Sequence, residues 1–483
     1  MMVIRKRFNN TNFFFILFLS ITIFLRIVNI ISEQIWADEA TSIYIAEAPL
    51  FEFWNLVIQD IHPPLYYLIL KAWILILGDS IFSCRLLSVI FSTATIPFLY
   101  LIGKEVKDKK LGLIIIFLYS ISPISIYYAN EIRSYSLLHL LFTIDLYFSI
   151  KCIKIPTIVR NYLLFGICGV LLIYTHYMGI LYFAILSLGI IIFNKKEITT
   201  YRNLLISVFI VVTSYIPWIP YAIEDFLGGA HGYAGGRLNL IYLLYWAFYY
   251  FIGPVPSNID DPYIFILIII TLLLFGFSII LGFILEDTFT AKNLIGGLSL
   301  IYLLESLGLY YLIYNTQAKI IKIHKFLKPI SQDTIKKIIN ILFISLLVTN
   351  IIIYPFFRAY YLQKPDWDGC IKKIKEDFKK GDIIIMGFKG GKAPYAMEYY
   401  SDINNFDLED NFYELNYDKE DIEEFFEDIR KDNITRIWIV NYWEKINDPH
   451  DKTEELLVDE YDLKKIEEYC FRLDISLVLY EIS

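Results

Sequence analysis

Near its start the chain carries the polar segment Ile35-Trp36-Ala37-Asp38-Glu39-Ala40, with a long apolar stretch before it and more apolar sequence after it. A second polar segment, Asp60-Ile61-His62-Pro63-Pro64-Leu65, follows further along the chain. Carboxylates beside a bilayer are costly to desolvate, so paired carboxylates at a membrane face indicate a helix cap, a metal site or a reaction. The sequence around these two segments therefore decides both the fold and the chemistry.

The composition is that of a membrane protein. Of the 483 residues, 57% are hydrophobic and 17% aromatic, and the mean hydropathy is +0.52. The apolar residues come in blocks of roughly 18–23, the length that spans a bilayer as a helix. The net charge of -8 conceals an asymmetry, because the acidic excess follows Asp366 while Lys/Arg clusters interrupt the apolar part. We expect a polytopic α-helical membrane protein with no surface for nucleic acid.

The basic clusters fix the orientation of the predicted spans. Arg5, Lys6 and Arg7 precede the first block, and excess Lys/Arg marks the cytoplasmic side, so the N-terminus is predicted to be cytoplasmic. The clusters within 104–110, 151–160, 195–202 and 319–337 then also lie inside. The stretch 65–77 is too short to span and predicts an interfacial or re-entrant helix. The expected spans, about eleven, are 13–31, 83–102, 111–127, 134–152, 161–175, 178–193, 203–220, 239–253, 263–285, 293–315 and 338–357.

This topology predicts a transmembrane domain at 1–357, with an acidic first external loop at 32–82, and an extracytoplasmic soluble domain at 358–483. In the soluble domain, short runs rich in β-branched residues predict strands at 382–386, 436–440 and 476–480, and helix-like segments precede the first two. We expect a small α/β domain with a glycine-rich turn at 387–392. Cys370 and Cys470 share this domain and can pair there if the compartment is oxidising.

Asp38 has two interpretations. It can be the N-cap of a short helix that runs through Ile43 and Ala46, which is the commonest role of an Asp before such a sequence. Glu39 beside it weakens that interpretation, because a cap needs only one acceptor. The two carboxylates can instead take part in a reaction at the membrane surface.

Asp60 and His62 fall in the same external loop. The two prolines that follow explain this segment equally well as the start of an interfacial helix with His62 at its surface. Asp38, Glu39, Asp60 and His62 nevertheless place three carboxylates and an imidazole in one external loop, and such a cluster can deprotonate an alcohol or hold a divalent cation. The candidate ligands of that cation are Asp38, Glu39, Asp60 and His62.

Further polar residues fall at the predicted outer ends of spans. Arg85 and the run from Tyr128 to Tyr135, which includes Glu131 and Arg133, are among them. Arginine at a span end commonly extends its charged group to the lipid headgroups, and guanidinium is also the best bidentate binder of phosphate. His176-Tyr177 falls on the same face, where a single histidine is more often structural.

The order of these motifs resembles that of GT-C glycosyltransferases. The most similar branch is the dolichyl-phosphate-mannose-protein mannosyltransferase-like family, glycosyltransferase family 39, and lipid A aminoarabinose transferases are more distant relatives. The resemblance covers roughly residues 13–220. The motifs are Trp36-x-Asp38-Glu39-Ala40, Asp60-x-His62-Pro63-Pro64-Leu65-Tyr66-Tyr67, Arg85-Leu86, Tyr128-Ala129-x-Glu131-x-Arg133-x-Tyr135 and Thr175-His176-Tyr177.

The resemblance implies a multi-pass enzyme of the cell membrane that moves a sugar of hexosyl or mannosyl type from a polyprenyl-phosphate donor, of dolichyl-phosphate type, to an extracytoplasmic acceptor with inversion. The acceptor is a glycan, a lipid or a protein, and membrane lipids surround the enzyme. In that scheme Asp38 is the general base and Glu39 supports it. The implied substrate-binding residues are Arg85 and Arg133 on the donor phosphate, Asp60 and His62 in the pocket or on a cation, and Glu131, Tyr135, His176 and Tyr177.

The later half departs from the family. It has no clear equivalent of the arginine-containing segment that many relatives carry before their last spans, unless Arg237 serves, and the outer domain is no β-trefoil. Protein as the acceptor therefore does not follow. A transporter or flippase of polyprenyl-linked sugars, or a non-catalytic assembly subunit, stays open as the alternative. Transporters carry charges at the bilayer midplane, where only Asp145 and Glu305 are expected here, so the sequence favours the enzyme.

Overall fold

The computed structural model describes residues 10–28, 30, 34–227, 295–314, 364–387, 393–408, 411–415, 425, 434–442, 463–471 and 475–482. The chain divides into two compact units. The first contains Met1–Ile30 and Ala48–Phe356, and the second contains Ile31–Glu47 and Phe357–Ser483. The segment that carries Asp38 and Glu39 therefore groups with the C-terminal residues.

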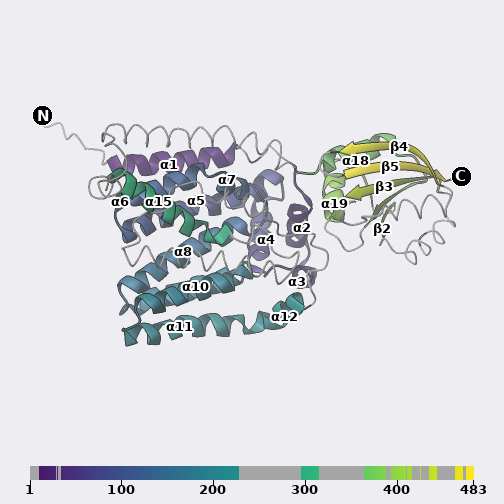
Figure 1. Ribbon diagram of the computed structural model, residues 1–483. Helices are drawn as coiled ribbons and strands as arrows, with labels where there is room; N and C mark the ends of the chain where they lie inside the picture. The colour runs from purple at the N-terminus through teal and green to yellow at the C-terminus, as the bar shows by residue number, and fades with distance from the viewer. Residues whose placement is uncertain are drawn as a thin grey trace, which may run out of the picture. The chain divides into compact units, whose positions relative to one another are not determined.

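The first unit is helical (Figure 1). Neighbouring helices pack side by side, as α8, α9 and α10 do with one another and α5 does with α6 and α8. Its described elements are α1 (Asn10–Ile27), α3 (Leu50–Gln59), α4 (Leu65–Leu77), α5 (Ile81–Val106), α6 (Lys109–Ile121), α7 (Pro123–Tyr128), α8 (Tyr135–Lys154), α9 (Val159–Ile173), α10 (Met178–Phe193), α11 (Ile198–Tyr215), η1 (Ile216–Trp218), α12 (Ile219–Leu227) and α15 (Leu298–Tyr314).

Helices occupy the predicted spans wherever the structure describes them. In that part of the chain three helical stretches are long and apolar enough to cross a membrane: Ile81–Val106, Tyr135–Lys154 and Ile198–Glu224. Shorter apolar helices occupy the other predicted positions. The predicted spans 239–253, 263–285 and 338–357 lie outside the described residues, as does Arg237. The number of spans stays a prediction.

Proline and glycine set the ends of the short helices. The predicted span 111–127 is divided into α6 and α7, because Pro123 has no N–H to continue the α6 ladder and fits the first position of a new helix. The helix predicted at 65–77 is confirmed as α4. It follows Pro64 and stops at Gly78, whose φ of 81° is in the left-handed region that favours glycine.

The second unit contains a five-stranded sheet in the order β2-β1-β3-β5-β4, beside helices α18 and α19 (Figure 1). Strands β2, β1 and β3 are parallel, whereas β5 is antiparallel to both β3 and β4. The predicted strands at 382–386, 436–440 and 476–480 are confirmed as β1, β3 and β5. The elements are α2 (Ala37–Glu47), α18 (Trp367–Asp377), β1 (Asp382–Gly387), α19 (Ala393–Ile403), β2 (Phe412–Leu415), β3 (Arg436–Tyr442), β4 (Leu463–Phe471) and β5 (Ile475–Ile482).

Apolar side chains of β1, β3 and β5 form one core of this unit, with Ile383, Ile437 and Tyr480 almost fully buried. Asp382 is also fully buried, and its carboxylate accepts hydrogen bonds from Arg436 Nε at 2.8 Å and from Trp438 Nε1 at 3.0 Å. The disulfide considered between the two outer cysteines is not formed, since Cys370 and Cys470 are both free. Burial of the Cys370 thiol raises its pKa.

Candidate active site

Helix α2 places both carboxylates of the first acidic segment in its first turn. The helix begins at Ala37, so Trp36 precedes it and Asp38 is its second residue. Glu39 is the third residue, and its Oε2 accepts a hydrogen bond from the Trp36 backbone N–H at 3.4 Å, as the acid of a capping box does. The interpretation of Asp38 as the N-cap is therefore wrong, because the helix starts two residues earlier than that cap would require and the cap contact comes from Glu39.

Glu39 is also one half of a buried ion pair. Its Oε2 contacts Nζ of Lys364, and the two side chains are 0% and 5% exposed. Asp38 is 5% exposed as a residue and also lies inside the protein. Negative charge in the first turn of a helix is favourable because the partial positive charge of the N-terminus lies there. The acid pair is thus held at a helix N-terminus with a cation on Glu39.

Asp60 and His62 form a second buried group, in the first unit. Asp60 Oδ2 accepts a hydrogen bond from the Tyr67 hydroxyl at 2.6 Å and lies 3.1 Å from Nδ1 of His62. Tyr67 lies in the first turn of α4, which begins at Leu65 with Pro64 as its N-cap, so the helix start places its hydroxyl near Asp60. The prolines therefore do open a helix, and the neighbouring Asp60 and His62 are buried rather than on the surface.

Arg133 extends this group from the other side. Its Nη2 lies 3.3 Å from Nε2 of His62. Arginine can only donate, so Nε2 accepts, and the ring is assigned as the neutral tautomer whose Nδ1–H donates to Asp60. The His176 ring packs edge-on against the His62 ring at 5.3 Å and lies 6.3 Å from the Tyr135 ring.

The segment around Arg133 contains buried polar atoms that no protein group satisfies. They belong to Asn130 (Oδ1), Ser134 (Oγ) and Tyr135 (OH), and these residues are at most 6% exposed. Each such atom costs about 1–3 kcal/mol when it has no partner. Groups of this kind are rare in native structures and call for a specific cause, such as a ligand that supplies the hydrogen bond.

The remaining predicted residues, Arg85, Glu131 and Tyr177, lie in the same unit. Arg85 is fully buried on α5, and its Nη1 donates to the Ile30 carbonyl at 2.9 Å. One turn further, Ser88 donates to the Glu131 carbonyl at 2.6 Å, which joins α5 to the segment before α8. Tyr177 accepts a hydrogen bond from Trp218 Nε1 at 3.4 Å. Arg85 and Arg133 are buried inside the protein, which argues against the alternative that they extend to the lipid headgroups.

The structure thus joins Asp60, His62, Arg133, Tyr135 and His176 through direct contacts, and describes Asp38 and Glu39 within the other unit. Within the described ranges, no three His, Cys, Asp or Glu side chains are grouped closely enough to hold a metal ion. The sequence did not single out Lys364 or assign a role to Tyr67. For Lys364 the available signal was weak, a lone lysine before Pro365-Asp366 where the soluble domain starts.

Comparison with protein families finds one match. Residues 61–221 match the family described as dolichyl-phosphate-mannose-protein mannosyltransferase. This range contains His62, Arg85, Arg133 and His176. No curated protein matches the chain.

Solved structures match over nearly the whole length. The apo structure of ArnT from Cupriavidus metallidurans has a TM-score of 0.63 and 11% identity, covering 98% of this chain and 98% of that chain. The same protein bound to undecaprenyl phosphate has a TM-score of 0.59 and 11% identity, covering 96% of this chain and 97% of that chain. Archaeal oligosaccharyltransferase AglB from Archaeoglobus fulgidus, in complex with an inhibitory peptide and a dolichol-phosphate, has a TM-score of 0.52 and 11% identity. The match covers 98% of this chain and 74% of that chain. Identities this low show the fold alone, and together with the family match they confirm the resemblance to GT-C glycosyltransferases of the mannosyltransferase and ArnT kinds.

Proposed function

We propose that this protein is a membrane glycosyltransferase that moves a sugar from a polyprenyl-phosphate-linked donor to an acceptor outside the cytoplasm, with inversion at the anomeric carbon. The proposal takes the donor to be of dolichyl-phosphate type and the sugar to be a hexose such as mannose. The acceptor is a glycan, a lipid or a protein. In the proposed orientation the protein crosses the membrane several times, its N-terminus is cytoplasmic and its C-terminal domain is extracytoplasmic.

One observation carries the proposal: a guanidinium, that of Arg133, is buried beside neutral His62 and next to polar atoms that lack a protein partner. A phosphate bearing a sugar can bond to all of these groups, because its oxygens accept from guanidinium and its hydroxyls can both donate to and accept from the unsatisfied polar atoms. Binding of undecaprenyl phosphate by ArnT, which has the same fold, supports the choice of a polyprenyl phosphate.

The proposed reaction is a single displacement. The acceptor oxygen attacks the anomeric carbon, its proton passes to Asp38, and the bond between that carbon and the phosphate oxygen breaks. The polyprenyl phosphate leaves with the electron pair. Arg133 and Arg85 stabilise the negative charge that grows on the phosphate, while the carboxylates stabilise positive charge on the sugar. Glu131, Tyr135, His176 and Tyr177 are proposed to bind the substrates.

A divalent cation on Asp38, Glu39, Asp60 and His62 stays a prediction. The proposed displacement proceeds with protein groups alone, since the structure already gives Glu39 a cation in Lys364 and gives Asp60 two donors. Treatment of the purified protein with a chelator separates the two schemes. Loss of transfer that added cation restores would establish the metal, whereas unchanged transfer would remove it from the mechanism.

The experiment that tests the function uses the purified full chain in lipid nanodiscs or proteoliposomes. Polyprenyl-phosphate-linked hexoses are offered with glycan, lipid and peptide acceptors, and the anomeric configuration of the product is determined by NMR. The proposal predicts transfer with inverted configuration. Movement of the donor between leaflets without transfer to any acceptor would instead establish the alternative, a transporter.

A further inference from the structure

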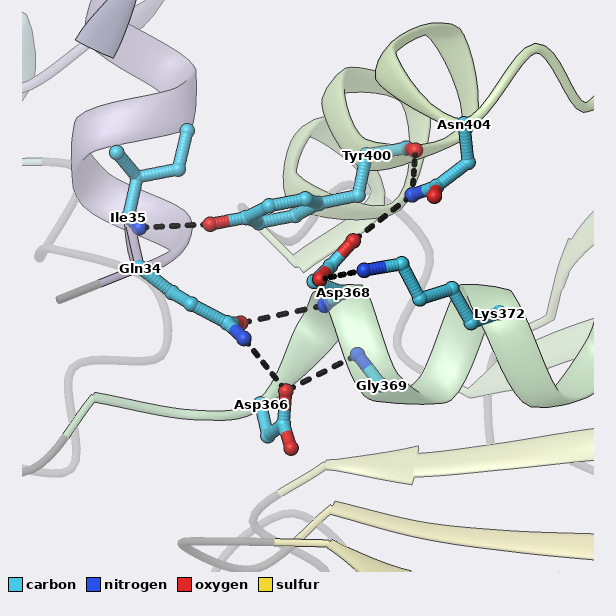
Figure 2. A network of polar contacts seen from close by, with 8 residues as sticks. All are labelled: Gln34, Ile35, Asp366, Asp368, Gly369, Lys372, Tyr400 and Asn404. Carbon is cyan, nitrogen blue, oxygen red and sulfur yellow. Dashed lines mark hydrogen bonds and ion pairs between the residues drawn. The ribbon is translucent and has the colours of Figure 1, made fainter. Parts of the chain in front are cut away.

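The segment that carries the proposed base is bonded to the C-terminal domain by residues that are far away in the sequence. Figure 2 shows the Gln34 side chain between two residues at the start of α18: its Nε2 donates to Asp366 Oδ1 at 2.6 Å, and its Oε1 accepts from the Asp368 N–H at 3.2 Å. The Ile35 N–H donates to the Tyr400 hydroxyl oxygen on α19 at 2.8 Å, across 365 residues of sequence.

These contacts are supported by the packing of α2 itself. Helix α2 packs on α19, where the Tyr44 ring lies 4.4 Å from the Tyr395 ring. Asp366 in turn caps α18 by accepting from the Gly369 N–H at 3.0 Å, which fixes the carboxylate that binds Gln34. The acidic segment is therefore bonded to elements whose own positions are set within the domain.

The charged member of these contacts is the buried ion pair between Glu39 and Lys364. Both side chains are buried, so each charge depends on the other for the interactions that water would otherwise supply. Glu39 also accepts from the Trp36 N–H, and through these two contacts it ties the first turn of α2 to the start of the C-terminal domain. Asp38, the proposed base, lies in the same turn, directly before Glu39.

We infer that Lys364 is a positioning residue for sugar transfer: through Glu39 it holds the first turn of α2, and with it Asp38, on the C-terminal domain. This inference rests on the proposed function of Asp38. The domain is then part of the catalytic machinery, as the support that fixes the base rather than as a separate module. A base displaced by about 1 Å from its reacting geometry can lose about 10²-fold in rate.

The test compares Lys364→Met, which keeps most of the side chain and removes the charge, with Lys364→Arg, which keeps the charge. Lys364→Met should lower kcat by about 10²-fold while the KM for the lipid-linked donor changes less than about twofold, because donor contacts are not removed. Hydrogen exchange of the α2 amides should become at least roughly tenfold faster. Lys364→Arg should recover most of both.

Asp382→Asn is the matched control, because Asp382 is buried in the same domain and bonds to Lys379, Arg436 and Trp438 rather than to the acidic segment. It should lower the melting temperature and leave kcat and α2 exchange unchanged. If Lys364→Met fails to fold, Tyr400→Phe removes the hydroxyl that accepts from the Ile35 N–H and should give a smaller effect in the same direction.

Two results would overturn the inference: α2 exchange that Lys364→Met and Tyr400→Phe leave unchanged, or a loss of kcat no larger than that of Asp382→Asn. Hydrogen exchange needs no substrate, so it decides whether Lys364 holds α2 even if the wild-type protein transfers no sugar. If the wild-type protein transfers no sugar, the proposed function fails, and the role of Lys364 as a positioning residue for transfer fails with it. If the wild-type protein transfers sugar but the variants leave α2 exchange unchanged, only the inference fails.

Discussion

Arg133 is the residue whose surroundings most resemble an anion site. Its guanidinium is buried, and His62 accepts a hydrogen bond from it. Asp60 is linked to Arg133 through His62, because it bonds to the opposite nitrogen of the same ring. Through these contacts the carboxylate orients the imidazole and the imidazole orients the guanidinium, a group that binds phosphate well.

Arg133→Ala should therefore weaken binding of a polyprenyl phosphate by about 1.5–3 kcal/mol, the scale of a charge-assisted hydrogen bond. Equilibrium binding of a labelled polyprenyl phosphate to the protein in nanodiscs measures it. Arg160→Ala on α9 is the control, because Arg160 is exposed and its loss changes the net charge equally. Equal affinity of the Arg133 variant and the control would return Arg133 to a purely structural role.

Tyr135 allows stability and binding to be separated. Its hydroxyl is buried without a partner, so Tyr135→Phe should leave the melting temperature unchanged or raise it, because the unsatisfied group is removed. If a substrate bonds to the hydroxyl, the same change should lower transfer by about 2- to 10-fold, the value of about 0.5–1.5 kcal/mol for one hydrogen bond.

Tyr119→Phe is the comparison for Tyr135→Phe. The Tyr119 hydroxyl donates to the Ser92 carbonyl at 2.7 Å, so its removal should lower the melting temperature and leave transfer nearly unchanged. A Tyr135→Phe variant that melts lower and transfers at the wild-type rate would show that its hydroxyl serves the fold and not the substrate.

At the scale of the elements, Asp108 joins two helices. It is the N-cap of α6, where its Oδ1 accepts from the Lys110 and Leu111 N–H groups at 2.9 and 3.0 Å, and its Oδ2 accepts from the Tyr310 hydroxyl of α15 at 2.7 Å. Burial by itself raises the pKa of Asp108, but these hydrogen bonds outweigh it and hold the pKa below its ordinary value.

Asp108→Ala should cost about 1–2 kcal/mol of stability, the usual value of an N-cap. Asn caps as well as Asp but does not titrate, so wild type and Asp108→Asn isolate the contribution of the charge. A lowered folded pKa gives stability that is present above about pH 3.9 and is lost as the pH falls through the folded value. The melting temperatures of wild type and Asp108→Asn should therefore differ at neutral pH and converge at acidic pH. A difference between the two proteins that does not change with pH would exclude the charge as its source.

Local sequence patterns predicted the elements that local physics sets. The apolar blocks predicted the helices, and Pro64 and Gly78 delimit α4 as expected. Strands β1, β3 and β5 were predicted because they are apolar and buried, whereas β4 was missed because its sequence, LKKIEEYCF, is mostly charged and exposed at the edge of the sheet. Periodicity and β-branched content carry little information for a polar edge strand.

The candidate site was predictable only in part, for the same reason. Asp60, His62 and Arg133 were identified by type and by their predicted side of the membrane, and they do meet. The Glu39–Lys364 pair was not predicted, since its partners are 325 residues apart and no local pattern joins them. The start of α2 lies two residues before the start that an Asp38 cap would require, so the sequence kept Asp38 open as a cap and missed the cap contact of Glu39.

At the scale of the whole molecule, orientation in the membrane is open to a direct test with a native residue. Cys470 is exposed on the edge strand β4, whereas the other cysteines are buried. A membrane-impermeant maleimide should label Cys470 in intact cells if the C-terminal domain is extracytoplasmic. In a Cys470→Ser background, Lys196→Cys, at an exposed position in a basic loop predicted to be cytoplasmic, should react only after lysis. The reverse pattern would contradict the predicted topology.

The central claim is that Asp38 is the general base, and Asp38→Asn in the purified full chain tests it most directly. The change is nearly isosteric but removes the ability to take a proton, and general-base assistance contributes about 10²–10⁴-fold in rate. Because Asp38 lies inside the first turn of α2 and Glu39 makes the cap contact, melting should stay close to the wild-type value, with only the small contribution of the Asp38 charge to the helix N-terminus lost. Asp402→Asn, at an exposed position of α19, is the control and should change neither quantity. We predict wild-type melting with sugar transfer lowered by about 10²–10⁴-fold; wild-type melting with wild-type transfer would contradict the claim.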